Sequence, residues 1–269
     1  MIRLPHVSLP PSAQEGLAGF QRQIDAIPDY AARVEEGKRL FQLKNFPTNP
    51  TFRQVRRALS AMCSGAQRCC YCEDSAGTDV EHIKPKDLYP ELVFVWENYL
   101  YACSGCNSPK QSRCVIFSQV TGQAMEVTRR RNDPVVPPEA GDPLLINPRT
   151  ENPLDFMILD LRGSFYFVPL AAPGSREYLR AEHTIQLLRL NDREFLREAR
   201  REAFTGYVAR LKVYIHEKRN GLPLENLQNL INSIQRLSHA TVWQEMKRQQ
   251  SRLPRLRDLF EAAPEALGW

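Results

Sequence analysis

The sequence predicts an α+β fold, in which a small core held together by cysteines lies between mainly helical segments. The core is predicted from two Cys-x-x-Cys pairs that enclose two short strand patterns, at residues 78–83 and 99–102. The flanks are predicted from apolar residues that recur at helical spacing on both sides of this unit. The chain therefore divides into an N-terminal helical region, the core, a Pro-rich loop, and a hairpin followed by helices: residues 1–65, 66–118, 119–155 and 156–269.

The N-terminal region contains three predicted helices. The first starts with a capping-box pattern, in which Glu15 follows Ser12 by three residues. The second is expected over residues 30–44. The third is expected to begin at a Thr51 cap and to end near Gly65, because glycine suits the position after a helix.

The region after the core is predicted to begin without regular structure. Six prolines in residues 119–155 indicate a long surface loop or lid. Residues 156–161 and 165–168 flank Arg-Gly-Ser and predict a β-hairpin. Periodic apolar positions then predict several helices, one of them capped by Asn191, and residues from Arg252 onward are expected to form a peripheral tail.

The bulk composition is typical of a globular protein, with 42% hydrophobic and 25% charged residues in a chain of 269. No apolar run reaches about 18 residues, and the first residues lack the apolar core of a signal peptide, so no membrane span and a cytoplasmic location are expected. In that compartment, the seven cysteines are not expected to form disulfides, and clustered cysteines indicate a metal site. The net charge of +5 permits a polyanionic partner without requiring one.

The two cysteine pairs predict a structural zinc site, because four thiolates can close a tetrahedral cage around one ion. The predicted ligands are Cys69, Cys72, Cys103 and Cys106. Cys70 offers a second register with Cys72, but Cys-x-x-Cys is the commoner spacing and favours Cys69. A redox couple, or cysteines that bind nothing, remain alternatives. Cys63 and Cys114 have no matched partner and are interpreted as small buried residues.

The segment between the cysteine pairs carries acidic residues and a histidine. Strand alternation places Asp79 and Glu81 on one face and His82 on the other. Asn98 precedes the second strand, and Asn107 directly follows the last cysteine in a predicted helix that runs to about residue 113. The predicted order is therefore strand, loop, strand, helix.

This arrangement resembles the ββα-metal fold of the HNH endonucleases, in particular the members with a four-cysteine zinc site. The resemblance implies a zinc-pinned ββα-metal nuclease core flanked by mainly helical segments. It also implies that His82 is the general base, that Glu81 and Asn107 are ligands of a catalytic Mg²⁺ or Mn²⁺ ion, and that Asn98 braces the loop.

Longer runs resemble, more narrowly, the HNH nucleases of bacterial anti-phage systems of the Septu and retron-associated kinds. These runs are residues 72–74, 81–86, 89–91 and 106–110. The resemblance implies metal-dependent hydrolysis of DNA as the effector step of a defence system. It also implies a partner, an ABC-type ATPase, which the long helical flanks are expected to dock.

The physical chemistry of these residues agrees with such roles. A histidine can accept a proton at neutral pH, and carboxylate and amide oxygens suit a hard divalent ion that stabilises a leaving oxygen. Asp79 shares a face with Glu81 and is a third ligand, an outer partner or a solvated residue. Candidates for phosphate contacts are Lys84, Lys86, Lys110 and Arg113, with ordinary surface charge as the alternative.

Two other classes of function are compatible with the same patterns. One is a zinc-knuckle protein that binds nucleic acid without hydrolysing it. The other is an adaptor whose helices dock an ATPase and whose nuclease core is catalytically silent. The set of Glu81, His82 and Asn107 favours the enzyme over both.

Overall fold

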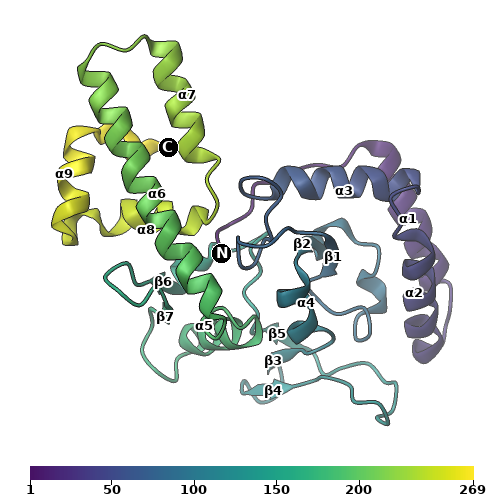
Figure 1. Ribbon diagram of the computed structural model, residues 1–269. Helices are drawn as coiled ribbons and strands as arrows, with labels where there is room; N and C mark the ends of the chain where they lie inside the picture. Colours follow the sequence, from purple (N-terminus) through teal and green to yellow (C-terminus); the bar gives the residue numbers. More distant parts are fainter.

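The computed structural model describes all 269 residues and confirms the α+β fold (Figure 1). The first three helices lie along the top and right of a hairpin and a short helix to form one lobe, and the C-terminal helices form the other. A single cluster of 57 buried apolar residues includes members from both lobes. The two lobes therefore share one hydrophobic core.

The three predicted N-terminal helices are present: α1 Pro11–Asp25, α2 Tyr30–Lys44 and α3 Pro50–Met62. The prediction for α2 is confirmed, with Asp29 as its cap. The predicted starts of the other two are wrong. Both begin at a proline, which lacks the N–H that a cap would satisfy, so Ser12 and Thr51 lie inside the first turn. Asn49 caps α3 instead, and that helix ends before Gly65.

The core has the predicted strand, loop, strand, helix order. Strand β1, Asp79–His82, pairs antiparallel with β2, Tyr99–Ala102. Helix α4, Ser104–Lys110, follows β2. The sequence predicted that this helix begins at Asn107, but it begins three residues earlier. Two short 3₁₀ turns, Pro90–Leu92 and Trp96–Asn98, shape the loop between the strands.

The predicted long loop contains a small sheet and is the main error in the fold prediction. Strand β3, Val115–Ser118, pairs with both β4, Ala124–Glu126, and β5, Gly141–Pro143. Pro143 is tolerated because β5 is an edge strand and needs no further N–H donor there. The hairpin prediction is confirmed by β6, Met157–Leu159, and β7, Phe167–Pro169.

The C-terminal region is helical, as predicted. Its helices are α5 Arg176–Leu187, α6 Glu194–Arg219, α7 Leu224–Gln235, α8 Ala240–Gln249 and α9 Pro254–Ala262. Asn191 does not cap α6, because its side chain is bonded to the backbone of Phe167. The expected peripheral tail is wrong, since Phe260 of α9 is buried with its ring 5.6 Å from that of Trp243. None of the helices is both long and apolar enough to span a bilayer.

Candidate metal centre and acidic cleft

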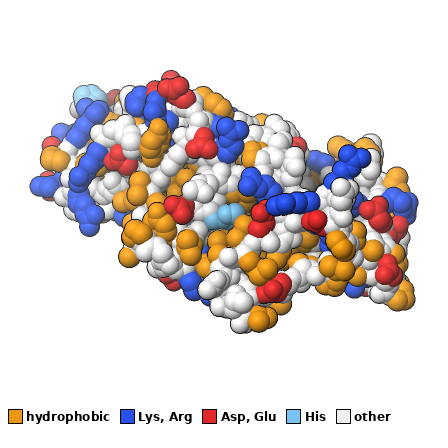
Figure 2. Space-filling model, turned by 90° about the horizontal axis from the view of Figure 1, so that it is seen from below, with side chains coloured by type: hydrophobic (Ala, Val, Ile, Leu, Met, Phe, Trp, Pro, Cys, Tyr) orange, Lys and Arg blue, Asp and Glu red, His pale blue; other side chains and the backbone are white.

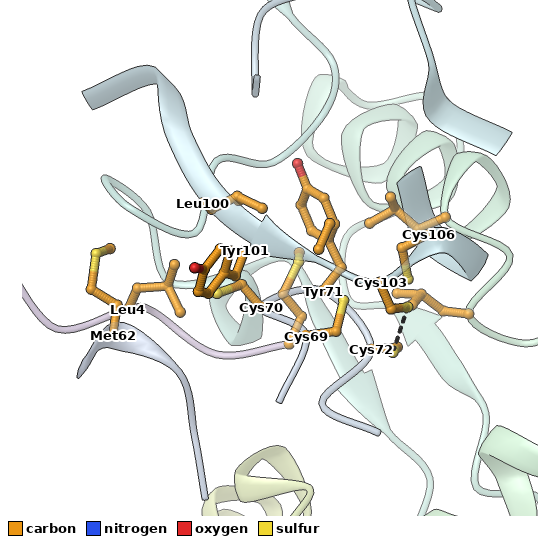
Figure 3. Packing of buried hydrophobic residues seen from close by; sticks show 14 of the residues in the cluster. Leu4, Met62, Cys69, Cys70, Tyr71, Cys72, Leu100, Tyr101, Cys103 and Cys106 are labelled. Carbon is orange, nitrogen blue, oxygen red and sulfur yellow. Dashed lines mark hydrogen bonds between the residues drawn. The ribbon is translucent and has the colours of Figure 1, made fainter. Parts of the chain in front are cut away.

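Four buried cysteines gather where the two strands meet α4. Cys69 and Cys72 lie in the loop before β1, Cys103 follows β2, and Cys106 is in the first turn of α4 (Figure 3). Their Sγ atoms all lie within 4.8 Å of one another, and those of Cys72 and Cys103 are 3.7 Å apart. A tetrahedral zinc–thiolate site places its sulfurs about 3.8 Å apart. The four predicted cysteines are therefore positioned to bind one metal ion.

The structure also shows that Cys69, and not Cys70, belongs to the cysteine cluster. The Sγ atom of Cys70 lies 3.9 Å from that of Cys63, which the sequence left without a partner. The backbone N–H of Cys70 donates to Tyr101, so the residue is part of the pairing with β2 while its neighbours Cys69 and Cys72 join the cluster.

The C-terminal region reaches this cysteine cluster through polar contacts. Arg193, just before α6, donates from Nη2 to the Sγ of Cys106 at 3.2 Å. A Cβ atom on Gly105 would lie 2.7 Å from Nη1 of this arginine, so glycine leaves the room that the contact needs. Hydrogen bonds from the neighbouring thiols, first from Cys106, hold the pKa of Cys103 far below its usual range. The hydrogen bonds with Cys103 instead raise the pKa values of Cys69 and Cys106, so the four thiols do not lose their protons equally.

Glu73, the residue after Cys72, provides a second connection. Its buried carboxylate accepts hydrogen bonds from the backbone N–H of Thr241 at 3.1 Å and from the amino group of Met1 at 2.7 Å. The hydroxyl of Thr241 also donates to it. Thr241 lies at the start of α8, so the far end of the chain closes over the cysteine loop.

All the predicted catalytic and metal-binding residues between the cysteine pairs and in α4, except Asn98, border one cleft of about 510 Å³. Asp79, Glu81 and His82 contribute from β1, and Asn107 contributes from α4. The remaining walls are mostly polar. Asp79 and Glu81 contact side chains of α4, whereas the ring of His82 packs against Phe41 of α2, as strand alternation predicts, and all three residues border the cleft.

His82 is oriented by a hydrogen bond and packed by aromatic rings. Its Nε2 lies 2.9 Å from the carbonyl oxygen of Val93, and because a carbonyl only accepts, Nε2 carries the proton. The lone pair is then on Nδ1. The rings of Phe41 and Tyr99 lie 4.5 and 5.1 Å from the imidazole, centre to centre. Burial, and then the charge of Lys86, lower the pKa of His82 to about 3. The imidazole is therefore neutral at pH 7.

The oxygen atoms of the side chains in the cleft are suitable ligands for a hard divalent cation. Asn107 donates from Nδ2 to Oδ2 of Asp79 at 3.0 Å, which leaves its amide oxygen free to bind a cation. Glu81 adds a second carboxylate, which is buried. Two carboxylates and an amide oxygen are the ligand types that Mg²⁺ and Mn²⁺ prefer. The residues present therefore fit such an ion.

Lys110 is not a phosphate contact, and that prediction is wrong. Its side chain is buried, and its Nζ donates to Glu81 Oε1 at 2.5 Å and to the carbonyl oxygen of His82 at 2.7 Å. The physical reason is the position of α4. The helix packs against β1, so its last residue faces that strand and not the solvent.

Asn98 lies in the loop between the strands and not in the cleft. Its Oδ1 accepts from the backbone N–H of Lys84 at 2.8 Å. Its Nδ2 donates to the carbonyl oxygens of Lys84 and Leu92 at 3.0 and 3.1 Å. These bonds join the two ends of the loop that carries Val93, the acceptor for His82.

The remaining basic candidates are divided between the cleft and the surface. Lys86 borders the cleft, whereas Lys84 lies over the ring of Tyr89 and Arg113 is exposed outside it. Arg56 of α3, which the sequence indicates is one of three arginines on a solvated helix face, also borders the cleft and donates to the side chain of Asn45 at 2.7 Å. No signal in the sequence separates Arg56 from the neighbouring arginines of α3.

Basic side chains do not form one continuous surface. Figure 2 shows Lys and Arg mixed with acidic residues over much of the face seen from below, with a denser group at the end that carries the C-terminal helices. At that end, Lys212, Arg219 and Arg255 border a separate cleft of about 620 Å³ between α6 and α9.

Comparisons with known proteins gave one short similarity. No family model matches the chain, and no solved structure matches it. Over 48 residues, the chain is 46% identical to the Septu protein PtuB of Bacillus thuringiensis. This segment is 16% of the chain and 19% of that protein. The similarity therefore concerns one segment, and both proteins extend well beyond it.

Proposed function

We propose that this protein is a metal-dependent HNH endonuclease that hydrolyses DNA phosphodiester bonds as the effector of an anti-phage defence system. The observation that carries the proposal is the convergence of His82, two carboxylates and Asn107 on one cleft beside the cysteine cluster. The partial similarity to PtuB supports the role in defence.

Each residue of the cleft has a part in the proposed hydrolysis. His82 accepts a proton from the attacking water at Nδ1, since its other ring nitrogen is engaged with Val93. Asp79, Glu81 and Asn107 would hold one Mg²⁺ or Mn²⁺ ion. When bound, this ion supplies charge stabilisation for the leaving oxygen.

The proposed role of the cysteine cluster is structural: it binds a zinc ion. Four thiolates leave no open coordination position, so such an ion binds no substrate. Bound by these cysteines, it would join the loop before β1 to the start of α4. In this way it fixes Asn107, the residue after Cys106, opposite Asp79.

Arg56 and Lys86 stand at the border of the cleft and are proposed to bind the DNA backbone. The proposed protein partner is an ABC-type ATPase of the same defence system. Its proposed docking surface is the outer face of the C-terminal helices, where basic residues are concentrated.

The test is cleavage of a supercoiled plasmid by the purified full chain. We expect nicked or linear DNA with Mg²⁺ or Mn²⁺, and no cleavage when EDTA removes these ions while zinc stays bound. His82→Ala should be inactive but still contain one zinc ion per chain. Full cleavage in EDTA with zinc retained would contradict a hydrolytic metal in the cleft.

A further inference from the structure

Lys110 makes the closest contact to a charged residue of the cleft. Its Nζ lies 2.5 Å from Oε1 of Glu81, and the two side chains are only 1% and 8% exposed. The same Nζ donates to the carbonyl oxygen of His82 at 2.7 Å. The other carboxylate oxygen, Oε2, accepts no hydrogen bond from the protein. A buried ammonium therefore already occupies one side of a carboxylate to which the proposed function assigns a metal ion.

We propose that Lys110 is a built-in counter-cation, which neutralises Glu81 in the free protein and keeps the cleft from binding a divalent ion tightly until a phosphate group is present. This inference rests on the proposed function and adds to it a control of metal binding. Lys110 is a positioning residue here, because it acts through Glu81.

The first argument is the cost of burying Glu81 alone. A buried carboxylate with no cation beside it strongly destabilises a fold. A divalent ion would remove this cost, but only while it is bound. Lys110 removes the cost permanently, since it enters from α4 and does not border the cleft. Folding of the hairpin then does not depend on a metal ion in the cleft.

The second argument is the balance of charge. Asp79 and Glu81 contribute −2 and Lys110 contributes +1, so the ligand set carries −1 in total. A divalent ion changes this sum to +1, and one phosphodiester group, with a charge of −1, brings it to zero. At the border, Arg56 and Lys86 add two positive charges and Asp87 adds one negative charge, so the border contributes a further +1. The ion and the phosphate are therefore each favoured by the presence of the other, and by linkage the effect is reciprocal.

The spacing along α4 supports this arrangement. Lys110 follows Asn107 by three residues, so the two side chains lie on neighbouring positions of one helix face. One contacts Asp79 and the other contacts Glu81. A single short helix thus engages both carboxylates of β1, one through an amide and one through an ammonium.

The experiment measures Mn²⁺ affinity by calorimetry on the zinc-loaded full chain, without DNA. Lys110→Met should bind Mn²⁺ at least about tenfold more tightly than the parent, because the repulsion from the ammonium is removed. Mn²⁺ should also raise the melting temperature of Lys110→Met more than that of the parent. Lys110→Arg, which keeps the charge, should match the parent, and Lys84→Met serves as a control outside the cleft.

Equal Mn²⁺ affinity in the parent and in Lys110→Met would overturn the inference. If Lys110→Met folds only when Mn²⁺ is added, the inference is supported, because the ion then replaces the missing ammonium. If Lys110→Met does not fold at all, the test is made on the parent protein. A short phosphorothioate duplex must then raise the Mn²⁺ affinity of the parent, and no increase overturns the inference. If neither the parent nor Lys110→Arg binds Mn²⁺ even with the duplex, the proposed function fails as well.

Discussion

The cysteine cluster and the acidic cleft are built on the same hairpin and the same short helix, but they hold their ligands in different ways. In the cluster, four sulfur atoms lie within 4.8 Å of one another, with only one arginine contact from outside. In the cleft, Glu81 is neutralised by Lys110, and Asp79 is bonded to Asn107. As thiolates, the four sulfurs would repel one another unless a cation lay between them, whereas each carboxylate that would hold a metal ion in the cleft already has a partner from α4. We therefore expect a permanent ion in the cluster and an exchangeable one in the cleft.

The largest effect should come from breaking the cluster. We expect Cys103→Ser to lose the metal and to unfold the core, because a structural zinc site contributes about 10–16 kcal/mol, which is comparable with the whole stability of a domain. Zinc content and circular dichroism measure this. Cys114→Ser is the matched control, since Cys114 lies outside the cluster, and it should keep both zinc and fold.

The next largest effect should come from the cleft and should leave the fold intact. We expect His82→Ala to lower the cleavage rate by about 10²–10⁴-fold, because it removes the proposed general base. Zinc content and DNA binding should stay near the parental values. His183→Ala, at a half-buried histidine of α5 outside the cleft, is the control. A cleavage rate near the parental one for His82→Ala would remove this residue from the mechanism.

The third prediction uses the pH dependence of stability. The pKa of His82 is about 3 in the folded protein, below the value of about 6.5 in an unfolded chain. Below about pH 6.5 the unfolded state therefore binds a proton that the folded state does not. The free energy of unfolding should fall with pH between about 6.5 and 3, by at most about 1.4 kcal/mol per pH unit from this residue.

Urea unfolding at a series of pH values measures this contribution. His82→Gln should show a shallower loss of stability than the parent over that range, and the same slope above it. His216→Gln, at an exposed histidine on α6, should leave the slope unchanged. Parallel curves for the parent and His82→Gln would mean that the buried imidazole does not resist protonation.

The smallest effect should come from the border of the cleft. We expect Arg56→Gln to weaken DNA binding a few-fold and to reduce the salt dependence by about one charge, because it removes one phosphate contact. Binding titrations at several salt concentrations measure this. Arg57→Gln, at the exposed neighbour on the same helix, should have less effect. If both substitutions weaken DNA binding equally, the DNA does not bind at the border of the cleft.

Local patterns were enough to predict much of the fold. Helix α2, strand β2 and the β6–β7 hairpin follow from periodicity and turn residues, because the interactions that form them are close in sequence. The sheet β3–β5 was missed because it pairs Ile116 with Pro143 across a segment rich in breakers. Helix α9 was missed because it is short, and its burial depends on contacts with α6 and α8.

The candidate site likewise has features that local sequence predicts and features that depend on distant packing. The cysteine cluster was predictable because the spacing of its ligands is a strong constraint on geometry. The burial of Lys110 and the place of Arg56 were not predictable, since they depend on how α4 and α3 pack against β1. Burial also lowers the pKa of His82, and no property of its sequence neighbours indicates that shift.

The bond between Glu73 and Thr241 has a consequence for synthesis on the ribosome. The two residues are 168 positions apart, and Glu73 is buried beside the cysteine cluster. At about 5–20 residues per second, roughly ten to thirty seconds pass between the translation of one and the other. During that time the carboxylate next to Cys72 lacks the partner that lies at the start of α8. The nascent chain therefore cannot complete the packing around its cysteine loop until the start of α8 has been made.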